Sequence, residues 1–450
     1  MTVRRATHAA MPLALFLALA STTSTAACAP GDDDAADDPA EESEEAMIER
    51  AREIHDRVIT LDTHIDISTA NFTAERNYTM DLPTQATLPK MEAGGLDVGW
   101  FVVYTSQGLL NDEGYATAYE NAVDKFDAIH RMVNEYAPDR IGLALTSDDV
   151  RRIAASGKLV AMIGVENAYP LGTDISRVEE FHERGARYMS LAHTGPNQLS
   201  DAHSGENDGD FLHGGLSEMG REAVEEMNRL GIMIDISHPS KPSIMQTLEI
   251  TRAPVMASHS SARGLSDVSR NLDDEQLHAV AANGGVVQTV ALRSFVNTTR
   301  NAAHREAMDA IEAEVAAQMG VEILGRGGMF ALPPDERDAY FARMTQVRAT
   351  AAERAADMDI PPDVSVADFV DQIDYMVNLI GLEHVGISSD FDGGGGVAGW
   401  DDASETFNVT LELVRRGYTE EDIGMLWSGN LLRVLDEVQE VAAMIQAEEG

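Results

Sequence analysis

Two side chains that are common metal ligands stand two residues apart at the end of an apolar run. The run RVITLDTHID, residues 57–66, ends with His64 and Asp66. Successive side chains of a strand point to opposite faces, so His64 and Asp66 share one face. Two polar groups that face one way at the end of a buried strand need a partner. That partner is either a hydrogen-bonding neighbour or a metal ion.

Residues of the same chemical kinds end five further apolar runs. They are Glu166, His193, His238, His259 and Asp390. Each one alone also fits an ordinary structural role, such as a capping residue or a buried histidine satisfied by hydrogen bonds. Imidazoles and carboxylates are suitable ligands for a zinc-like ion, and the whole set is too large for one tetrahedral ion. It suits a pair of ions about 3.5–4 Å apart that share a carboxylate and a hydroxide.

Glu166 is the candidate for the shared carboxylate. Some two-metal barrels use a carboxylated lysine at a strand end instead. The chain has only Lys90, Lys125, Lys158 and Lys241, and none falls at the carboxyl end of a predicted strand. A carboxylate that follows the apolar run AMIGV needs compensation by charge or hydrogen bonds, which a metal would supply.

Eight apolar runs alternate with helical patterns and would position these residues. The predicted strands are 57–66, 96–105, 158–167, 186–194, 231–238, 253–260, 284–292 and 384–392. The clearest helical patterns are 119–136, 217–231 and 273–285. Strands that alternate with helices indicate a parallel sheet of the α/β class, and eight such units indicate a (β/α)8 TIM barrel. The carboxyl ends of barrel strands converge on one mouth, so the polar residues are expected to meet there.

A helical segment separates the seventh and eighth predicted strands. We interpret residues 300–365 as an insertion in the barrel that would cover its mouth, and residues 47–450 as one catalytic domain. Two further histidines, His203 and His213, lie in the Gly-rich loop 200–215 and are weaker candidates for lining the site. His384 begins the eighth strand, so it falls at the opposite end of the barrel, where a structural role is expected.

The N-terminal residues are expected to lie outside the barrel. Residues 1–28 resemble a signal peptide that ends at Cys28, the only cysteine, which is a candidate lipid-attachment site. Residues 29–46 are rich in acidic residues and predict a disordered tether. We therefore expect an exported protein of the periplasm or cell envelope, anchored to the membrane only through Cys28. Ordinary secretory cleavage, which leaves a soluble protein, is the alternative.

The excess of acidic residues limits the kinds of partner that the protein is expected to bind. Lys and Arg number 33 against 76 Asp and Glu, which gives a formal net charge of -43. Binding nucleic acid requires a basic surface, so nucleic acid is not an expected partner. A heavily solvated acidic surface is the simplest interpretation of this composition.

Several motifs in order make the chain similar to a known family. They include LDTHID, GVEN, YMSLAHTGPNQLSDA, GIMIDISHPS, APVMASHSSARGL and HVGISSDFDGG. With these motifs the chain resembles the membrane dipeptidase (renal dipeptidase) family of zinc peptidases, which have an amidohydrolase-type barrel. The resemblance implies hydrolysis of dipeptides, including ones with a D-residue at the C-terminal position, through a hydroxide between two zinc ions. It also suggests a homodimer by analogy.

The resemblance implies a role for each matching residue. His64 and Asp66 would hold one zinc ion, His238 and His259 the other, and Glu166 would bridge both. A separate group would act on the substrate. His193 would contact the substrate and stabilise the oxyanion, Arg270 in the motif SRNL would bind the terminal carboxylate, and Asp390 would transfer the proton. Asp390 is preferred over Asp392 because it lies nearer the strand end.

Two other functions remain open at this point. The same barrel and metals would also suit another amide, a lactone or an ester as substrate. A lipoprotein that binds peptides or metal without turnover is the third interpretation, although a complete ligand set argues against it.

Overall fold

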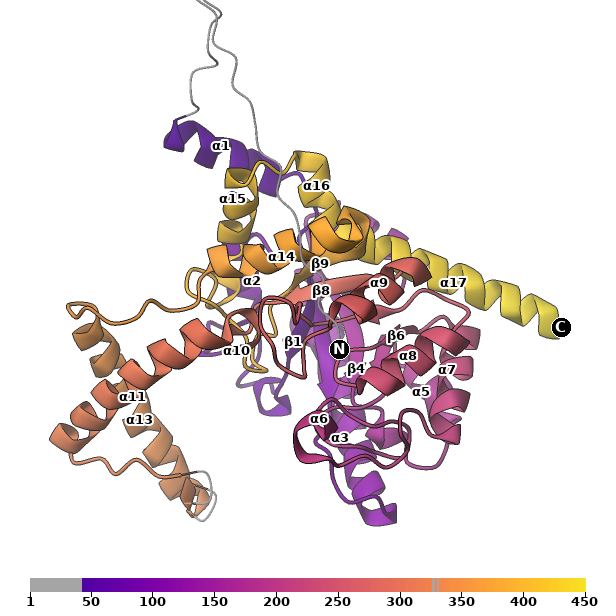
Figure 1. Ribbon diagram of the computed structural model, residues 1–450, viewed down its shortest axis with the longest axis horizontal. Coiled ribbons are helices and arrows are strands. Elements are labelled where there is room, and N and C mark those ends of the chain that lie inside the picture. Colours follow the sequence, from indigo (N-terminus) through magenta and orange to yellow (C-terminus); the bar gives the residue numbers. More distant parts are fainter. Residues whose placement is uncertain (1–42, 326–327, 330–331) are drawn as a thin grey trace, which may run out of the picture. The chain divides into compact units, whose positions relative to one another are not determined.

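A parallel barrel organises the chain, and its strands follow the apolar runs of the sequence. The computed structural model is shown in Figure 1. The barrel order is β1 (Leu61–Asp66), β2 (Val98–Tyr104), β4 (Leu159–Glu166), β5 (Ala186–Ser190), β6 (Met233–Asp235), β7 (Met256–Ala257), β8 (Val286–Val290) and β9 (Val385–Ser388). All neighbouring strands are parallel, and the amide of Asp66 donates to the carbonyl of Phe391 at 2.9 Å, just beyond β9. The nearly closed eight-stranded barrel confirms the expected fold class.

The structure describes residues 43–450, except 326–327 and 330–331. The signal-like segment with Cys28 and most of the predicted tether therefore lie outside the described residues. The end of that tether is corrected, because residues 44–46 begin helix α1 (Glu44–His55). Glu44 and Glu45 favour a helix start by their charge, and the buried Ala51 and Ile54 hold the helix in place. No helix of the described part is both long and apolar enough to span a bilayer.

One short strand was missed by the sequence analysis. Strand β3 (Ile141–Leu143) pairs with the first half of β4, where Ile141 lies opposite Leu159. β5 pairs with the second half of β4, beginning at Ile163. β3 thus fills an edge that β5 leaves uncovered. A run of three residues is too short to show the period of a strand in the sequence.

Helices surround the barrel in the expected alternation. The remaining helices of the barrel unit are α2 (Leu88–Gly94), α3 (Asp112–Arg131), α4 (Ser147–Ala154), α5 (Arg177–Glu183), α6 (Gly205–Asp208), α7 (Glu218–Leu230), α8 (Lys241–Ile250), α9 (Asp274–Asn283), α10 (Arg293–Val296), α14 (Val366–Ile380), α15 (Phe407–Arg415), α16 (Glu420–Gly424) and α17 (Asn430–Glu449). The predicted stop of 217–231 is confirmed, since Gly231 ends α7 with a φ of 80°. The predicted helix 119–136 begins earlier than expected, because Asn111 caps α3 by accepting from the amide of Gly114.

The barrel interior is packed with large apolar side chains below the mouth. Trp100 stacks on Tyr188 with ring centroids 5.1 Å apart. Gly164 makes room for the Tyr188 ring, because a Cβ there would lie 2.0 Å from a ring atom. The C-terminal helix α17 adds Leu431 and Leu435 to this cluster. The polar strand ends therefore stand on a rigid apolar base.

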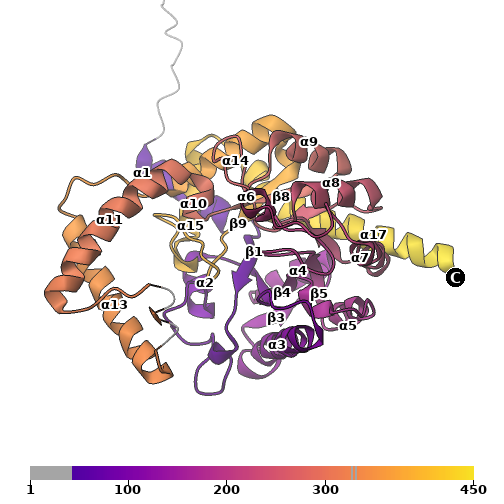
Figure 2. The same ribbon diagram turned by 60° about the horizontal axis from the view of Figure 1, so that its bottom comes forward.

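The predicted insertion is a helical arm. Helices α11 (Thr298–Met319) and α13 (Pro334–Ala355) pack on each other through a small cluster that includes Ile311, Val315 and Val347. Both views show this arm extending sideways from the barrel (Figure 1, Figure 2). The expectation that the insertion covers the mouth is not met, because none of its described residues lines the cavity there.

Candidate active site

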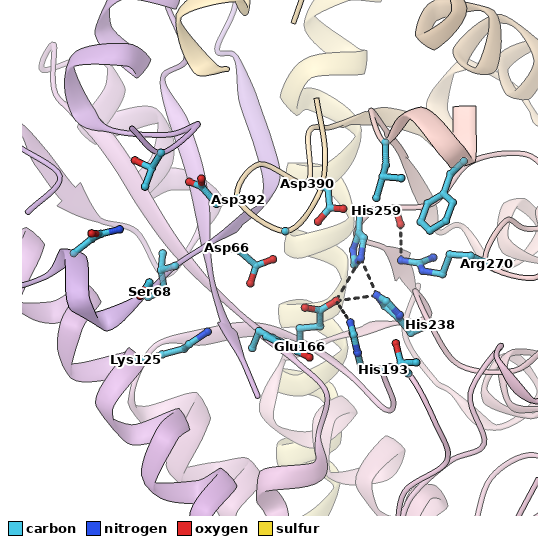
Figure 3. A pocket seen from close by; sticks show the side chains of 18 of the residues that line it. Asp66, Ser68, Lys125, Glu166, His193, His238, His259, Arg270, Asp390 and Asp392 are labelled. Atoms are coloured by element: carbon cyan, nitrogen blue, oxygen red, sulfur yellow. Dashed lines mark hydrogen bonds and ion pairs between the residues drawn. The ribbon is translucent and has the colours of Figure 1, made fainter. Parts of the chain in front are cut away.

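A cavity opens at the carboxyl ends of the barrel strands and has a volume of about 630 Å³. Seven of the predicted site residues line it, as Figure 3 shows. They are Asp66, Glu166, His193, His238, His259, Arg270 and Asp390. The eighth, His64, lies beneath them, fully buried and in contact with Asp66 and Glu166. The structure therefore brings all of the predicted site residues together.

Glu166 lies at the centre of the histidines. Its Oε1 is 2.8 Å from Nε2 of His238 and 3.4 Å from Nε2 of His259. Its Oε2 is 3.5 Å from Nε2 of His64. The dashed lines in Figure 3 show Glu166 joined to His193, His238 and His259. One carboxylate thus faces His238 and His259 with one oxygen and His64 with the other.

The donor atoms form two metal-binding groups that share Glu166. One group is His64, Asp66 and Glu166, and the other is Glu166, His238 and His259; within each, the ligand atoms lie within 4.8 Å of one another. A third group joins His64 and His259 to Asp390. The pattern is the one that a pair of divalent ions with a bridging carboxylate requires. The ligand assignments themselves stay predictions.

Unsatisfied nitrogens also fit a metal centre. Nε2 of His64 is buried and has no hydrogen-bond partner among the described residues. The Nε2 atoms of His238 and His259 face each other at 2.9 Å, although at most one of two neutral imidazoles can donate there. Burial holds the pKa of His238 and of His259 well below the usual value, which keeps them in the neutral form that binds metals. The donor set therefore fits zinc-like ions.

Hydrogen bonds behind the ligands fix the orientation of their rings. Nδ1 of His259 lies 2.7 Å from Oγ of Ser258, whose hydroxyl donates to the buried Asp235 at 2.6 Å. Nδ1 of His64 lies 3.2 Å from the hydroxyl of Tyr188. With Nδ1 engaged, each ring turns Nε2 toward Glu166. Sequence reasoning missed these supports, because small polar residues within strands are common and carry no distinctive spacing.

Two site residues adopt strained backbone conformations. His238 has a φ of 78° and Asp390 a φ of 60°, in the left-handed region that disfavours side chains. Such a conformation costs on the order of 1–3 kcal/mol and persists only where the surroundings enforce it. At His238 and Asp390 the strained turn directs the side chain into the cavity just after a strand has ended.

Asp390 is set apart from the neighbouring acid by its surroundings. Burial raises the pKa of Asp390 well above its ordinary value, and the carboxylates of Asp66 and Glu166 add to this shift, although His64 opposes it. Asp392 instead accepts hydrogen bonds from the backbone amides of Gln85 and Ala86. Asp392 thus anchors a loop, whereas Asp390, with its raised pKa, is the stronger candidate for proton exchange.

Arg270 is a buried cation that forms no ion pair with any carboxylate in the described part of the chain. Its side chain is 4% exposed and donates to Oγ of Ser260 at 2.8 Å and to the carbonyl of His259 at 2.7 Å. Its Nε is buried without a partner among the described residues. Burial lowers the pKa of Arg270 to about 10, against the opposing effect of Asp235, Glu166 and Asp390. A carboxylate entering the cavity would satisfy this guanidinium.

The histidines outside the ligand set divide into two kinds. His193 lies in the cavity wall, with its ring 4.2 Å from that of His238, and His203 also lines the cavity. His213 does not line it; its Nε2 bonds the carbonyl of Asn197 at 2.9 Å. His384 bonds the carbonyl of Gly285 at 2.8 Å, consistent with the expected structural role. Of the two weaker candidates, the structure therefore places only His203 at the cavity.

Lys125 and Tyr104 are among the lining residues that were not foreseen from the sequence. Lys125 reaches the cavity from α3, and Tyr104 reaches it from the end of β2. A lysine within a helical pattern is usually a surface residue, so its sequence position gave no sign of the cavity. Tyr104 ends an apolar strand without the metal-ligand chemistry that drew attention to the other strand ends.

Comparisons with known proteins agree with this geometry. Residues 48–340 and 341–449 match the family described as membrane dipeptidase (peptidase family M19). The dipeptidase aclJ of Aspergillus oryzae is 31% identical over 83% of this chain and 74% of its own length. The dipeptidase verJ of Clonostachys rogersoniana is 30% identical over 78% of this chain and 74% of its own.

Solved structures show the same fold. The probable dipeptidase PvdM from Pseudomonas aeruginosa superposes with a TM-score of 0.73 at 32% identity, covering 89% of this chain and all of that one. A metallo peptidase from Rhodobacter sphaeroides, liganded with a phosphinate mimic of L-Ala-D-Ala, has a TM-score of 0.62 at 22% identity, over 85% of this chain and 99% of that one. Together with the family match, these likenesses show that the chain belongs to the membrane dipeptidase family, peptidase family M19.

Proposed function

We propose that this protein is a dipeptidase that uses two zinc ions to hydrolyse the peptide bond of dipeptides. One observation carries the proposal. Glu166 is shared by two ligand groups, and the buried guanidinium of Arg270, which forms no ion pair with a described residue, faces the same cavity. A hydrolytic centre beside a carboxylate-binding cation selects a substrate whose free carboxyl end lies one residue from the bond that is cut.

The metal ligands divide between the two groups. His64 and Asp66 would hold one ion, His238 and His259 the other, and Glu166 would contact both. Zinc ions bound in this way act as Lewis acids and bring the pKa of a water molecule close to neutrality. The outer hydrogen bonds of Ser258 and Tyr188 keep the imidazoles turned toward this position.

The remaining site residues handle the substrate and the proton. Arg270 binds the terminal carboxylate and orients the peptide in the cavity. His193 donates from its ring to the carbonyl oxygen as negative charge develops there. Asp390 accepts a proton from the attacking water and delivers it to the amine that leaves, so that one water is consumed and two amino acids are released.

The decisive experiment is amino-acid release from a dipeptide library, with and without a chelator, on metal-analysed protein. We expect release that the chelator abolishes and that zinc restores. The library should include dipeptides with a C-terminal D-residue, because the Rhodobacter relative binds a mimic of L-Ala-D-Ala. Turnover of lactones or esters in place of dipeptides would favour the other barrel chemistry. Metal binding without any turnover would favour a binding protein.

We also propose that the protein is exported and attached to a membrane of the cell envelope through a lipid on Cys28. The signal-like residues 1–28 and the position of the only cysteine support this. Incorporation of labelled fatty acid should be lost in Cys28→Ala. Labelling that persists in this variant would contradict the anchor. A homodimer, suggested by analogy, is checked by the mass in solution from light scattering.

A further inference from the structure

A second buried cation lines the active-site cavity, opposite Arg270. Lys125 is 8% exposed, comes from α3, and points its amine into the cavity. In Figure 3 Lys125 and Arg270 lie on opposite sides of Glu166. The hydrolytic centre therefore stands between two positive charges that arise from distant parts of the chain.

Lys125 differs from the other three lysines in its contacts. Lys90 and Lys241 form ion pairs with acidic side chains, and Lys158 donates to the carbonyl of Pro138. The amine of Lys125 forms no hydrogen bond or ion pair with any described residue, and it lies 5.4 Å from the centroid of the Tyr104 ring. Burying an ammonium group without a counter-charge is costly unless a ligand supplies one.

The acids whose charges act on Lys125 are already engaged. Burial lowers the pKa of Lys125, and the charges of Asp66 and Glu166 oppose this shift from beyond ion-pair distance. Asp66 and Glu166 belong to the metal-binding groups, so their oxygens face the histidines. An anion for Lys125 must therefore come from a molecule in the cavity.

The orientation of a bound dipeptide determines which of its groups lies near Lys125. The terminal carboxylate is held at Arg270 and the scissile carbonyl lies near Glu166, so the N-terminal residue extends away from Arg270. We propose that Lys125, with Tyr104 beside it, binds a carboxylate on the side chain of that residue, and that the preferred substrates are dipeptides beginning with glutamate or aspartate. This inference rests on the proposed dipeptidase function and names its substrate class.

The test compares two substrates that differ only in one charge. kcat/KM is measured for Glu-Ala and Gln-Ala with the wild type, Lys125→Met and Lys125→Arg. We expect the wild type to favour Glu-Ala by about tenfold or more, as for a charge-assisted contact in a shielded site. Lys125→Met should bring the ratio of the two kcat/KM values close to one, and Lys125→Arg should keep most of the preference. Lys158→Met, altered just before β4 at the opposite end of the barrel, is the matched control and should keep the wild-type ratio.

Other outcomes would overturn the inference. Equal losses on Glu-Ala and Gln-Ala in Lys125→Met would mean that Lys125 only supports the structure, and a wild type without preference would exclude the subsite. If the wild type hydrolyses no dipeptide, the proposed function fails separately. Calorimetric binding of Glu-Ala and Gln-Ala to the wild type and Lys125→Met then decides the subsite. A preference for Glu-Ala that depends on Lys125 supports it, and equal binding overturns it.

Discussion

The barrel mouth and the α11–α13 arm were both recognised from the sequence, but they are built in opposite ways. In the mouth, buried polar groups from separate strands surround one cavity, and several of them have no hydrogen-bond partner among the described residues. In the arm, helices α11 and α13 bury apolar residues such as Val347 against each other, while Phe341 stays 47% exposed. A region that buries unsatisfied polar groups at a cost in stability is a region shaped by function. The arm buries apolar side chains between its own helices, and its first turn is tied to α14 by the ion pair of Arg300 and Asp368 at 2.6 Å.

The largest effect on activity is expected when the mouth loses the negative charge of Glu166, which both ligand groups share. Glu166→Gln should reduce dipeptide kcat/KM on the order of a thousandfold or more and lower the zinc content, because both ions lose a ligand. Activity assays and metal analysis on the same preparation check this. Wild-type zinc content together with wild-type turnover would contradict the role of Glu166.

The next largest effect is expected at Asp390. Asp390→Asn should retain zinc and lower kcat by about a hundred- to ten-thousandfold, since the amide cannot relay a proton. Asp392→Asn is the matched control. Its carboxylate bonds loop amides, so a smaller fall in kcat is expected. Similar losses in both variants would leave the proton transfer without an assigned residue.

Arg270→Met sharpens the assignment of the carboxylate site. We expect kcat/KM for a free dipeptide to fall about a hundredfold, because a charge-assisted contact is lost, while the same dipeptide with an amidated C-terminus is affected much less. Both rates are measured with one enzyme preparation. An equal fall for the two substrates would show that Arg270 supports the loop rather than the substrate.

A smaller effect is expected at the residues that hydrogen-bond to the proposed metal ligands. Ser258→Ala removes the link between His259 and Asp235, and should weaken zinc binding by about 10- to 100-fold. Ser258→Thr, which keeps the hydroxyl, should bind zinc more tightly than the alanine variant. Zinc titration with a competing chelator measures both. Unchanged affinity in Ser258→Ala would mean that His259 does not need this support.

The smallest effect on activity is expected in the arm. Met344→Ala removes a buried side chain from the arm cluster and should destabilise the arm by about 2–5 kcal/mol. Hydrogen exchange should rise in α11 and α13, while dipeptide kcat/KM stays within about twofold of the wild type. A large loss of turnover would show that the arm and the mouth are coupled.

The sequence predicts the strands better than it predicts their ends. All eight apolar runs contain a barrel strand, because residues buried on both sides of a sheet form continuous apolar segments. The strands are shorter than expected, however. β7 covers only Met256–Ala257 within the predicted run 253–260, so His259 stands in the loop after it. Periodicity locates such a residue near the mouth, and the family motifs were needed to assign it a ligand role.

Several residues outside the periodic pattern of the strands were found only in the structure. Lys125 reaches the cavity because α3 packs beside the end of β2, a tertiary arrangement that leaves no local trace in the chain. Asp235 supports His259 through Ser258 from a neighbouring strand, and this link likewise requires the barrel to form first. Arg270 was assigned by resemblance alone. Burial without a charge partner is the physical feature that now supports its role.

The most direct test of the central claim is to locate the bound metal. Crystals of the zinc-loaded protein should give two anomalous scattering peaks at the barrel mouth, on either side of the Glu166 carboxylate. One peak should lie against His64 and Asp66, and the other against His238 and His259. A single peak, or peaks that Glu166 does not touch, would contradict a two-metal centre bridged by this residue.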